Sequence, residues 1–230
     1  MSVFQKILAF VALFLFSLSA QAQTASSIDM FWEANSYVPS LYQGKALPTS
    51  DGNIRVFAIP PESFGDSSRA SYIWKINGTV LGSKSGTGRS SLDIVGSPFI
   101  DTNLIIVDVT GVNGTSGTGI LRIPYVKPKV ILYENSPLGG ILFSQALQGR
   151  LLAEADKDIT LLSYPYFFST QKLNSNLSYT WEINGTTAKA LGHEITARSE
   201  ITGTSTVDLQ VYSLTNVLQR ASERVSIVLQ

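Results

Sequence analysis

Cysteine is absent from the 230 residues of the chain, and histidine occurs once, as His193. The absence of thiols excludes disulfides, thiolate-bound zinc, iron–sulfur clusters and a cysteine nucleophile. A single imidazole also leaves little for a histidine metal site or for acid–base catalysis. Charge is scarce as well, because 17 basic and 17 acidic residues cancel and together make up 15% of the chain. The sequence thus lacks the basic surface that nucleic acids require, and we expect no nucleic-acid partner.

Motifs of catalysis are missing too. No Gly-x-Ser-x-Gly nucleophile elbow occurs, and residues 82–88 (GSKSGTG) lack the Gly-Lys-Ser/Thr ending of a phosphate-binding loop. His193 is followed by Glu194, but neighbouring residues of a strand point to opposite faces, so we expect a solvated histidine rather than a proton relay. No pair of carboxylates can be assigned a cleft for glycoside hydrolysis. We therefore expect a protein that is not an enzyme.

The N-terminal residues 1–22 have the pattern of a cleaved signal peptide. Lys6 ends a short positive region, residues 7–18 (ILAFVALFLFSL) are apolar, and residues 20–22 (AQA) form a cleavage site before Gln23. An uncleaved anchor is the alternative, but the apolar run is short of the roughly 20 residues that span a bilayer. We expect an exported protein, periplasmic, cell-surface or extracellular, with no membrane insertion after cleavage. Export without cysteine favours a bacterial envelope.

The rest of the chain repeats itself. The block at residues 71–79 (SYIWKINGT) returns as residues 178–186 (SYTWEINGT) with seven of nine positions identical. Three further pairs of blocks occur in the same order at a near-constant offset: 54–60 and 159–165, 31–36 and 132–136, and 41–47 and 142–147. These repeats predict two tandem domains, residues 27–127 and 128–230. The two prolines of residues 124–129 (PYVKPK) predict a short, stiff connection between them.

Each copy is expected to fold into short strands. Tyr72, Trp74 and Ile76 alternate with other residues, and Asn77-Gly78 follows at once, as in a tight type I′ hairpin turn. Residues 104–110 suit a central, mostly buried strand, and residues 206–212 are their counterpart. A helix is the main alternative to a strand at residues 141–155, because Leu, Ala and Gln also support a helical turn. Their match to residues 41–47 and the Gly149 in their middle argue against a long helix. The pattern therefore predicts an all-β fold of two antiparallel β-sandwiches.

Trp74 and Trp181 stand at the same place in the two copies, in the third major strand before the Asn-Gly turn. With this block and strand pattern, the chain resembles the immunoglobulin-like and PKD-like modules of bacterial surface proteins. The resemblance implies that both tryptophans pack in the core between two sheets and that such domains occur in tandem. The chain lacks the cysteine pair of immunoglobulins proper and the Gly-Asp-Gly turn of many PKD domains. An architecture of this kind hosts many functions.

Aromatic residues are the best candidates for ligand contacts. Four of them flank Pro165, in the turn after a strand: Tyr164, Tyr166, Phe167 and Phe168. Two others, Tyr37 and Tyr42, flank a proline-containing loop of the first copy. Exposed rings could stack on sugars or anchor a protein partner, whereas buried rings would close the core. Three alternating carboxylates, Glu154, Asp156 and Asp158, could bind calcium or form a solvated turn with Lys157. We expect no other cofactor.

Two hypotheses about function follow. The first is a non-enzymatic tandem β-sandwich that serves as a structural, adhesive or protein-interaction module of a bacterial cell envelope or surface assembly. Its partner would be an envelope or surface protein. The second is a carbohydrate-binding module that uses the aromatic loop at residues 164–168, with a glycan as its ligand.

Overall fold

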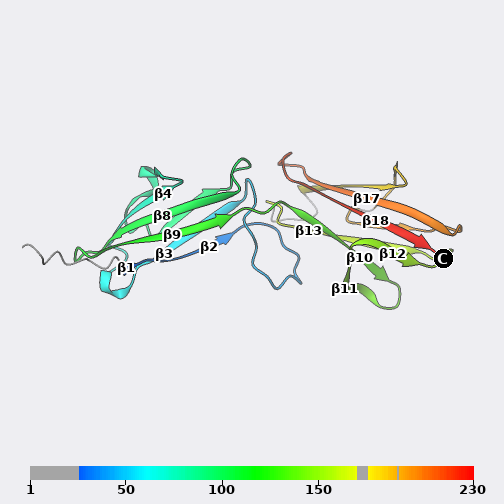
Figure 1. Cartoon of the computed structure of the whole chain (residues 1–230), viewed down its shortest axis with the longest axis horizontal. Helices are drawn as coiled ribbons and strands as arrows, with labels where there is room; N and C mark the ends of the chain where they lie inside the picture. The colour runs from blue at the N-terminus through cyan, green and yellow to red at the C-terminus, as the bar shows by residue number, and fades with distance from the viewer. Residues whose placement is uncertain (1–25, 170–175, 191) are drawn as a thin grey trace, which may run out of the picture.

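The computed structural model describes residues 26–169, 176–190 and 192–230, which fold into two β-sandwiches (Figure 1). The first sandwich comprises residues 26–126 and the second residues 129–230, and they lie end to end along the long axis. The predicted signal peptide at residues 1–22 lies outside the described residues. In the described part of the chain, no helix has the length and hydropathy needed to cross a membrane.

The first sandwich consists of two sheets. One has the strand order β1-β9-β8-β4-β5, with β6 beside β4, and the other has the order β2-β3-β7. All pairs are antiparallel except β1 with β9. The strands are β1 (Ser26–Ser27), β2 (Asp29–Ala34), β3 (Asn53–Ile59), β4 (Ser71–Ile76), β5 (Thr79–Val80), β6 (Gly86–Thr87), β7 (Ser91–Val95), β8 (Thr102–Thr110) and β9 (Ser116–Pro124). Two short 3₁₀ helices, Glu62–Phe64 and Gly82–Lys84, lie between them.

The second sandwich repeats this arrangement. Its sheets have the orders β12-β18-β17-β14-β15 and β11-β10-β13-β16, and only β12 with β18 is parallel. The strands are β10 (Lys129–Ser136), β11 (Gly140–Leu147), β12 (Gly149–Ala153), β13 (Ile159–Tyr166), β14 (Leu177–Ile183), β15 (Thr186–Thr187), β16 (Glu194–Ala197), β17 (Gly203–Ser213) and β18 (Arg220–Leu229). The predicted all-β fold of two immunoglobulin-like sandwiches is therefore confirmed.

The repeated tryptophan block has the same role in both copies. Trp74 and Trp181 are 0% and 1% exposed and belong to two separate hydrophobic clusters, one in each sandwich. Each indole N–H donates to a backbone carbonyl, at 2.7 Å to Arg89 and at 2.9 Å to Gly192. Each ring therefore buries its large apolar area without leaving its polar atom unpaired.

The Asn-Gly turns after the tryptophans also repeat. Asn77 and Asn184 have φ values of 49° and 51°, and the glycines that follow them have positive φ as well, as a type I′ turn requires. The Asn77 side-chain oxygen accepts the N–H of Leu104 at 2.9 Å, and that of Asn184 accepts the N–H of Thr206 at 2.8 Å. Each turn thus fixes its hairpin against the neighbouring central strand.

Residues 141–155 form strands, as their sequence favoured, and no long helix. The chain bends after β11 at Gly149, the first residue of β12, whose φ is 77°. The matched residues 41–47 of the first sandwich differ, because they form no strand and leave only an isolated bridge between Thr49 and Val126. Pro39 and Pro48 flank them and cannot donate backbone hydrogen bonds to a strand pair. Independent folding of residues 27–127 and 128–230 stays a prediction.

Candidate interaction site at the junction of the sandwiches

The segment of residues 35–52, here called the junction loop, belongs to the first sandwich by sequence but contacts the second. The Tyr37 N–H donates to the Phe168 carbonyl at 2.7 Å, and the Phe167 N–H donates to the Tyr37 carbonyl at 2.7 Å. Two successive residues, Phe167 and Phe168, thus oppose the single residue Tyr37, as in an antiparallel β-bulge, and Phe167 has a positive φ of 62°. We call these two bonds the backbone rung. The two sandwiches are therefore joined by backbone hydrogen bonds in addition to the connecting chain.

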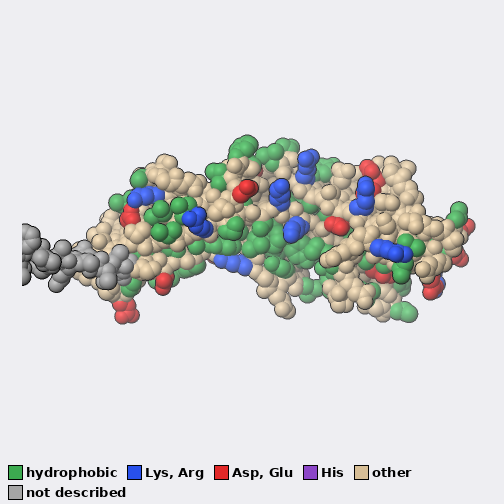
Figure 2. Space-filling model, viewed as in Figure 1, with side chains coloured by type: hydrophobic (Ala, Val, Ile, Leu, Met, Phe, Trp, Pro, Cys, Tyr) green, Lys and Arg blue, Asp and Glu red, His purple; other side chains and the backbone are tan. Residues whose placement is uncertain are grey.

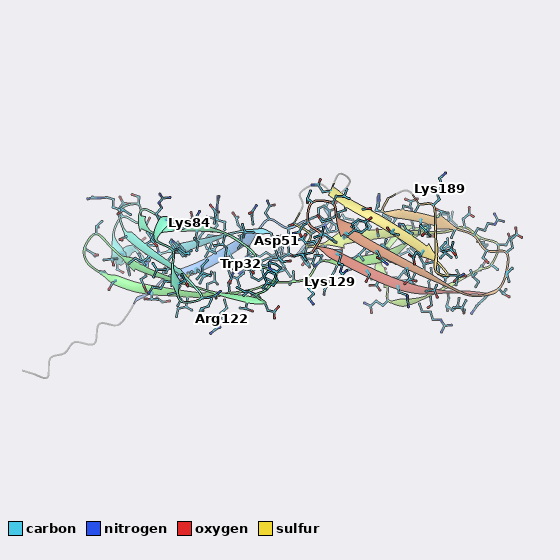
Figure 3. The ribbon with its side chains drawn as sticks, turned by 90° about the horizontal axis from the view of Figure 1, so that it is seen from above. Trp32, Asp51, Lys84, Arg122, Lys129 and Lys189 are labelled. Carbon is cyan, nitrogen blue, oxygen red and sulfur yellow. The ribbon has the colours of Figure 1, made fainter. Side chains whose placement is uncertain are left out.

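A second group of polar contacts lies at the end of the junction loop. The Asn216 side-chain amide donates to the Asp51 carboxylate at 2.8 Å. The fully buried Gln219 donates its side-chain amide to the Ser50 carbonyl and accepts the Ser169 N–H at 2.6 Å. Figure 3 shows Asp51 at the end of the first sandwich that faces the second. A buried amide that satisfies one backbone group from each sandwich ties their relative position to the core.

The junction loop is itself held in shape by local contacts. The Ser36 hydroxyl donates to the Leu47 carbonyl at 2.7 Å, which closes the base of the loop. A Cβ atom on Gly44 would lie 2.4 Å from the Tyr42 ring, so the close approach of this ring requires glycine. The Lys45 ammonium lies 3.5 Å from the centroid of the Trp32 ring, at cation–π distance. These contacts direct Tyr42 towards the second sandwich.

Aromatic rings from both sandwiches meet beside the backbone rung. Tyr42 makes edge contacts with Tyr166, at a centroid distance of 5.6 Å, and with Phe167, at 6.0 Å. A second set of rings, all on the second sandwich, contacts one another at centroid distances of 5.3–5.7 Å: Tyr133, Phe143 and Tyr164. We call these six rings together with Tyr37 the junction aromatic cluster. Figure 2 shows hydrophobic side chains gathered where the sandwiches meet.

Two phenol groups of the cluster, those of Tyr37 and Tyr166, have raised pKa values. Burial, followed by the neighbouring Tyr133 and Tyr42, raises the pKa of Tyr166 to about 12. Burial and the nearby Tyr164 likewise raise the pKa of Tyr37. Removing a group from water disfavours its charged form, which for tyrosine is the phenolate. The contact between the two sandwiches is therefore partly dehydrated at Tyr37 and Tyr166.

The structure brings together five of the six aromatic residues singled out in the sequence. The sixth, Phe168, is 0% exposed and lies in the core of the second sandwich, and Phe167 is 8% exposed. Sequence reasoning missed Tyr133 and Phe143. Both stand in blocks that repeat, since Phe143 matches Tyr42 in the alignment of residues 142–147 with 41–47. This match of two aromatic residues in the repeat was the sequence signal that could have identified Phe143.

Two of the three carboxylates considered for calcium form ion pairs. Glu154 forms an ion pair with Lys157, and the Asp156 carboxylate lies 2.6 Å from the Arg198 guanidinium. Within residues 26–169, 176–190 and 192–230, no group of three or more His, Cys, Asp or Glu side chains could hold a metal ion. The two alternatives for Glu154, Asp156 and Asp158, a calcium site or a solvated turn, both stay untested.

Asp156 is instead the structural counterpart of Asp51. Both residues have positive φ, 64° and 57°. Each donates its N–H across the turn, Asp156 to Ser199 at 2.8 Å and Asp51 to Gly96 at 2.9 Å. In the first sandwich this position contacts the next sandwich, whereas in the second it pairs with Arg198.

Two other motifs take structural positions. His193, expected to be solvated, is half-buried, with its ring 6.5 Å from that of Tyr179, and its carbonyl accepts the Ser163 N–H at 2.8 Å. Residues 82–88 form a 3₁₀ turn followed by β6, which pairs with β4. The glycine-rich motif therefore lies between strands, as its missing phosphate-loop ending indicated.

Comparisons with known proteins add little beyond the fold. Neither the protein-family models nor the curated proteins gave a match. Among solved structures, the three N-terminal domains of the bacteriophage RB49 Hoc protein are 14% identical with a TM-score of 0.48, covering 89% of this chain and 59% of theirs. The Clostridium thermocellum CbhA fibronectin(III)-like modules are 12% identical with a TM-score of 0.30 (84% of this chain and 93% of theirs). Murine CEACAM1b is 13% identical with a TM-score of 0.30 (88% and 99%). The assignment of immunoglobulin-like sandwiches therefore rests on the strand order and pairing of this chain.

Proposed function

We propose that this chain is an exported, non-enzymatic interaction module that acts in a bacterial cell envelope or surface assembly. In this proposal it is a relative of the bacterial immunoglobulin-like and PKD-like surface modules. The observation that carries the proposal is the backbone rung between Tyr37 and the Phe167–Phe168 segment. Two domains that act independently require only a connecting chain. A module that presents its surfaces at a fixed distance and angle also requires bonds between the domains, such as these.

The connecting chain supports the same interpretation. The Tyr125 N–H donates to the Asp101 carbonyl at 2.8 Å, and the Val126 N–H donates to the Pro48 carbonyl at 2.8 Å. Pro128 follows and has a fixed φ. The linker is thus hydrogen-bonded to the first sandwich up to Val126, and only Lys127 and Pro128 lie between that residue and the start of the second at Lys129. A connection of this kind transmits orientation rather than allowing free rotation.

The experiment that tests this function is photo-crosslinking of the full-length protein in its native cell. A photoreactive amino acid replaces exposed apolar residues one at a time, for example Phe99, Ile120 or Val217, which are 91%, 65% and 86% exposed. The same replacement at Ser83, an exposed residue of the loop at 82–88, controls for random collisions. Specific crosslinks to one or a few envelope proteins are the expected result. A processed, exported protein that crosslinks to no protein from any position would contradict the proposal.

Glycan binding is the second candidate, and the exposure of Phe143 favours it. This ring is 41% exposed and stands at the rim of the junction aromatic cluster. An exposed aromatic face offers apolar area on which a sugar ring can pack. Phe143→Ala should then abolish retention on a glycan array, while the control Phe99→Ala, at an exposed ring outside the cluster, should not. Equal retention by both variants would exclude this use of the cluster.

A further inference from the structure

The larger sheet of the first sandwich has an edge that its own strands cover only in part. β1 pairs with β9 at just two residues, Gly117 and Thr118. The next contact along this edge is the bridge between Val126 and Thr49. We call residues 120–124 of β9, which lie between these two contacts, the free edge.

Backbone groups of alternate residues in the free edge point away from the sheet. The Tyr125 N–H donates to the carbonyl that precedes β8, whereas the Val126 N–H donates on the open side, to the Pro48 carbonyl, each at 2.8 Å. Because this direction alternates along a strand, Ile120 and Arg122 direct their N–H and C=O groups to the open side. In the described part of the chain, no hydrogen bond reaches these four groups. Both side chains are exposed, so the row is open to a further strand.

The second sandwich fills the same position with a strand of its own. There β12 runs parallel to β18 over five residue pairs. The Gln230 N–H donates to the Ala153 carbonyl at 3.0 Å, as the Val126 N–H does to the Pro48 carbonyl in the first sandwich. These equivalent bonds place β12 against the part of β18 that matches the free edge. Leu151 of β12 is 9% exposed and belongs to the core, so this position takes an inward aliphatic side chain.

The segment of the first sandwich that matches β12 is turned elsewhere. Counted back from the equivalent carbonyls of Pro48 and Ala153, residues 44–48 (GKALP) match β12 (GRLLA) in structure. The Lys45 ammonium donates instead to the Trp32 carbonyl of β2, in the other sheet, and lies over the Trp32 ring. The segment belongs to the junction loop, which contacts the second sandwich. The joint between the sandwiches thus leaves the free edge without the strand that closes the second sandwich.

We propose that a partner protein adds an extended segment to the free edge, as a strand parallel to β9. The inference rests on the proposed function, because it identifies the contact by which the interaction module holds its partner. β12 indicates the chemistry of this segment: backbone groups that bond to Ile120 and Arg122, and one aliphatic side chain that faces the core as Leu151 does. In strand addition the main-chain bonds supply affinity and the inward side chain supplies specificity. The free edge is about 17 Å long at the rise of a strand, so the segment is short.

NMR measurements of amide exchange on the full mature protein test the inference. The probe is a capped peptide of residues 148–154 (QGRLLAE), which contains β12. In the free protein the Arg122 amide should exchange fast, and the Ser226 amide, which faces β12, should exchange slowly. The peptide should bind with a Kd of about 1 mM or lower, so that about 10 mM peptide slows exchange at Arg122 about tenfold. The same peptide with Leu151→Asp should not bind, because it places a carboxylate against the core.

Two variants at Arg122 separate the role of the backbone from that of the side chain. Arg122→Pro removes the edge-facing N–H and should weaken peptide binding at least about tenfold. The strand tolerates proline at such a position, as Pro124 shows, because the lost N–H has no partner within the sheet. Arg122→Ala keeps the N–H and should bind as the wild type does. In the native cell, a photoreactive residue at Ile120 should crosslink a partner in the Arg122→Ala background and none in the Arg122→Pro background.

The wild-type exchange measurement decides the matter even if Arg122→Pro folds poorly. An Arg122 amide as protected as that of Ser226 in the free protein would overturn the proposal, because residues 44–48 would then close the edge themselves. Unchanged exchange at about 10 mM peptide would overturn it too. So would a folded Arg122→Pro protein that binds the peptide, or crosslinks from Ile120, as the wild type does. Crosslinks from Phe99 and Val217 to an envelope protein would still support the proposed function in each case, so the two fail separately.

Discussion

The junction between the sandwiches makes a prediction that can be worked out for one residue, Gln219. Its side chain is fully buried, donates to the Ser50 carbonyl in the first sandwich and accepts the Ser169 N–H in the second. Gln219→Ala leaves both backbone groups without this partner. An unsatisfied buried group costs about 1–3 kcal/mol, and because Ser50 and Ser169 are half-buried we take the low end, about 2 kcal/mol for the two together.

Urea denaturation of the mature protein measures this loss. For a slope of about 2 kcal/mol per molar urea, the midpoint should fall by about 1 M. Gln219→Glu should lose a similar amount, because its carboxylate can still accept the Ser169 N–H but turns an oxygen towards the Ser50 carbonyl. Gln210→Ala, at an exposed position on β17, is the control and should leave the midpoint in place.

Hydrogen exchange shows whether the loss occurs at the junction. The Tyr37 amide, which bonds to Phe168 across the junction, should exchange faster in Gln219→Ala than in the wild type. The Trp181 backbone amide, within the core strand β14, should change much less. A midpoint shift below about 0.2 M, within the error of such measurements, would refute the reasoning. So would a large shift with unchanged exchange at Tyr37.

Three further predictions concern the core, the tyrosines and the carboxylates. Trp74→Ala and Trp181→Ala should each destabilise their own sandwich by about 3–5 kcal/mol, which calorimetry measures. In each variant the unfolding transition of the affected sandwich should separate from that of the other, whereas the two overlap in the wild type. Because the pKa of Tyr166 is raised to about 12 in the folded state from 10.0, its contribution to stability is complete below pH 10 and is lost as the pH rises towards 12; Tyr166→Phe should make this alkaline loss of stability shallower in denaturation curves. Millimolar calcium should leave the melting temperature unchanged, because Lys157 and Arg198 pair with Glu154 and Asp156, and a rise of several degrees would instead support the metal site.

Features decided by local chemistry could be predicted from the sequence. The alternation around Trp74 and Trp181 and the Asn-Gly turns specify strands and hairpins through contacts within a few residues or with one neighbouring strand. The same holds for residues 141–155, where Gly149 requires a bend. These elements depend little on what lies across the junction. Their sequence signal was therefore sufficient.

Features decided by distant partners could not be predicted in this way. The matched segments 41–47 and 142–147 fold differently, because the first contacts the second sandwich and the other pairs with β10. Phe168 lies in the core of the second sandwich rather than at its surface. Beyond the end of β13 the chain is held by its backbone hydrogen bonds to Tyr37, and it then turns towards the core. Residues 104–110 were expected to be mostly buried, yet Leu104 and Ile106 point outward. The aliphatic run of residues 104–107 has the same sequence whether its second face is buried or exposed.

The parallel edge strands have a consequence for mechanical load. In the first sandwich β1, the first described strand, runs in the same direction as the exit strand β9, so tension along the long axis pulls the two past each other. In the second sandwich the strand parallel to the exit strand β18 is β12, which follows β10 and β11 in the chain. Hydrogen bonds between strands that are sheared in this way are strained at the same time, whereas in peeling they break one after another. The second sandwich has five register pairs between β12 and β18, whereas the first has two between β1 and β9 and one bridge at Thr49. A molecule stretched along its long axis should therefore yield first in its N-terminal sandwich, where the parallel contact has fewer register pairs.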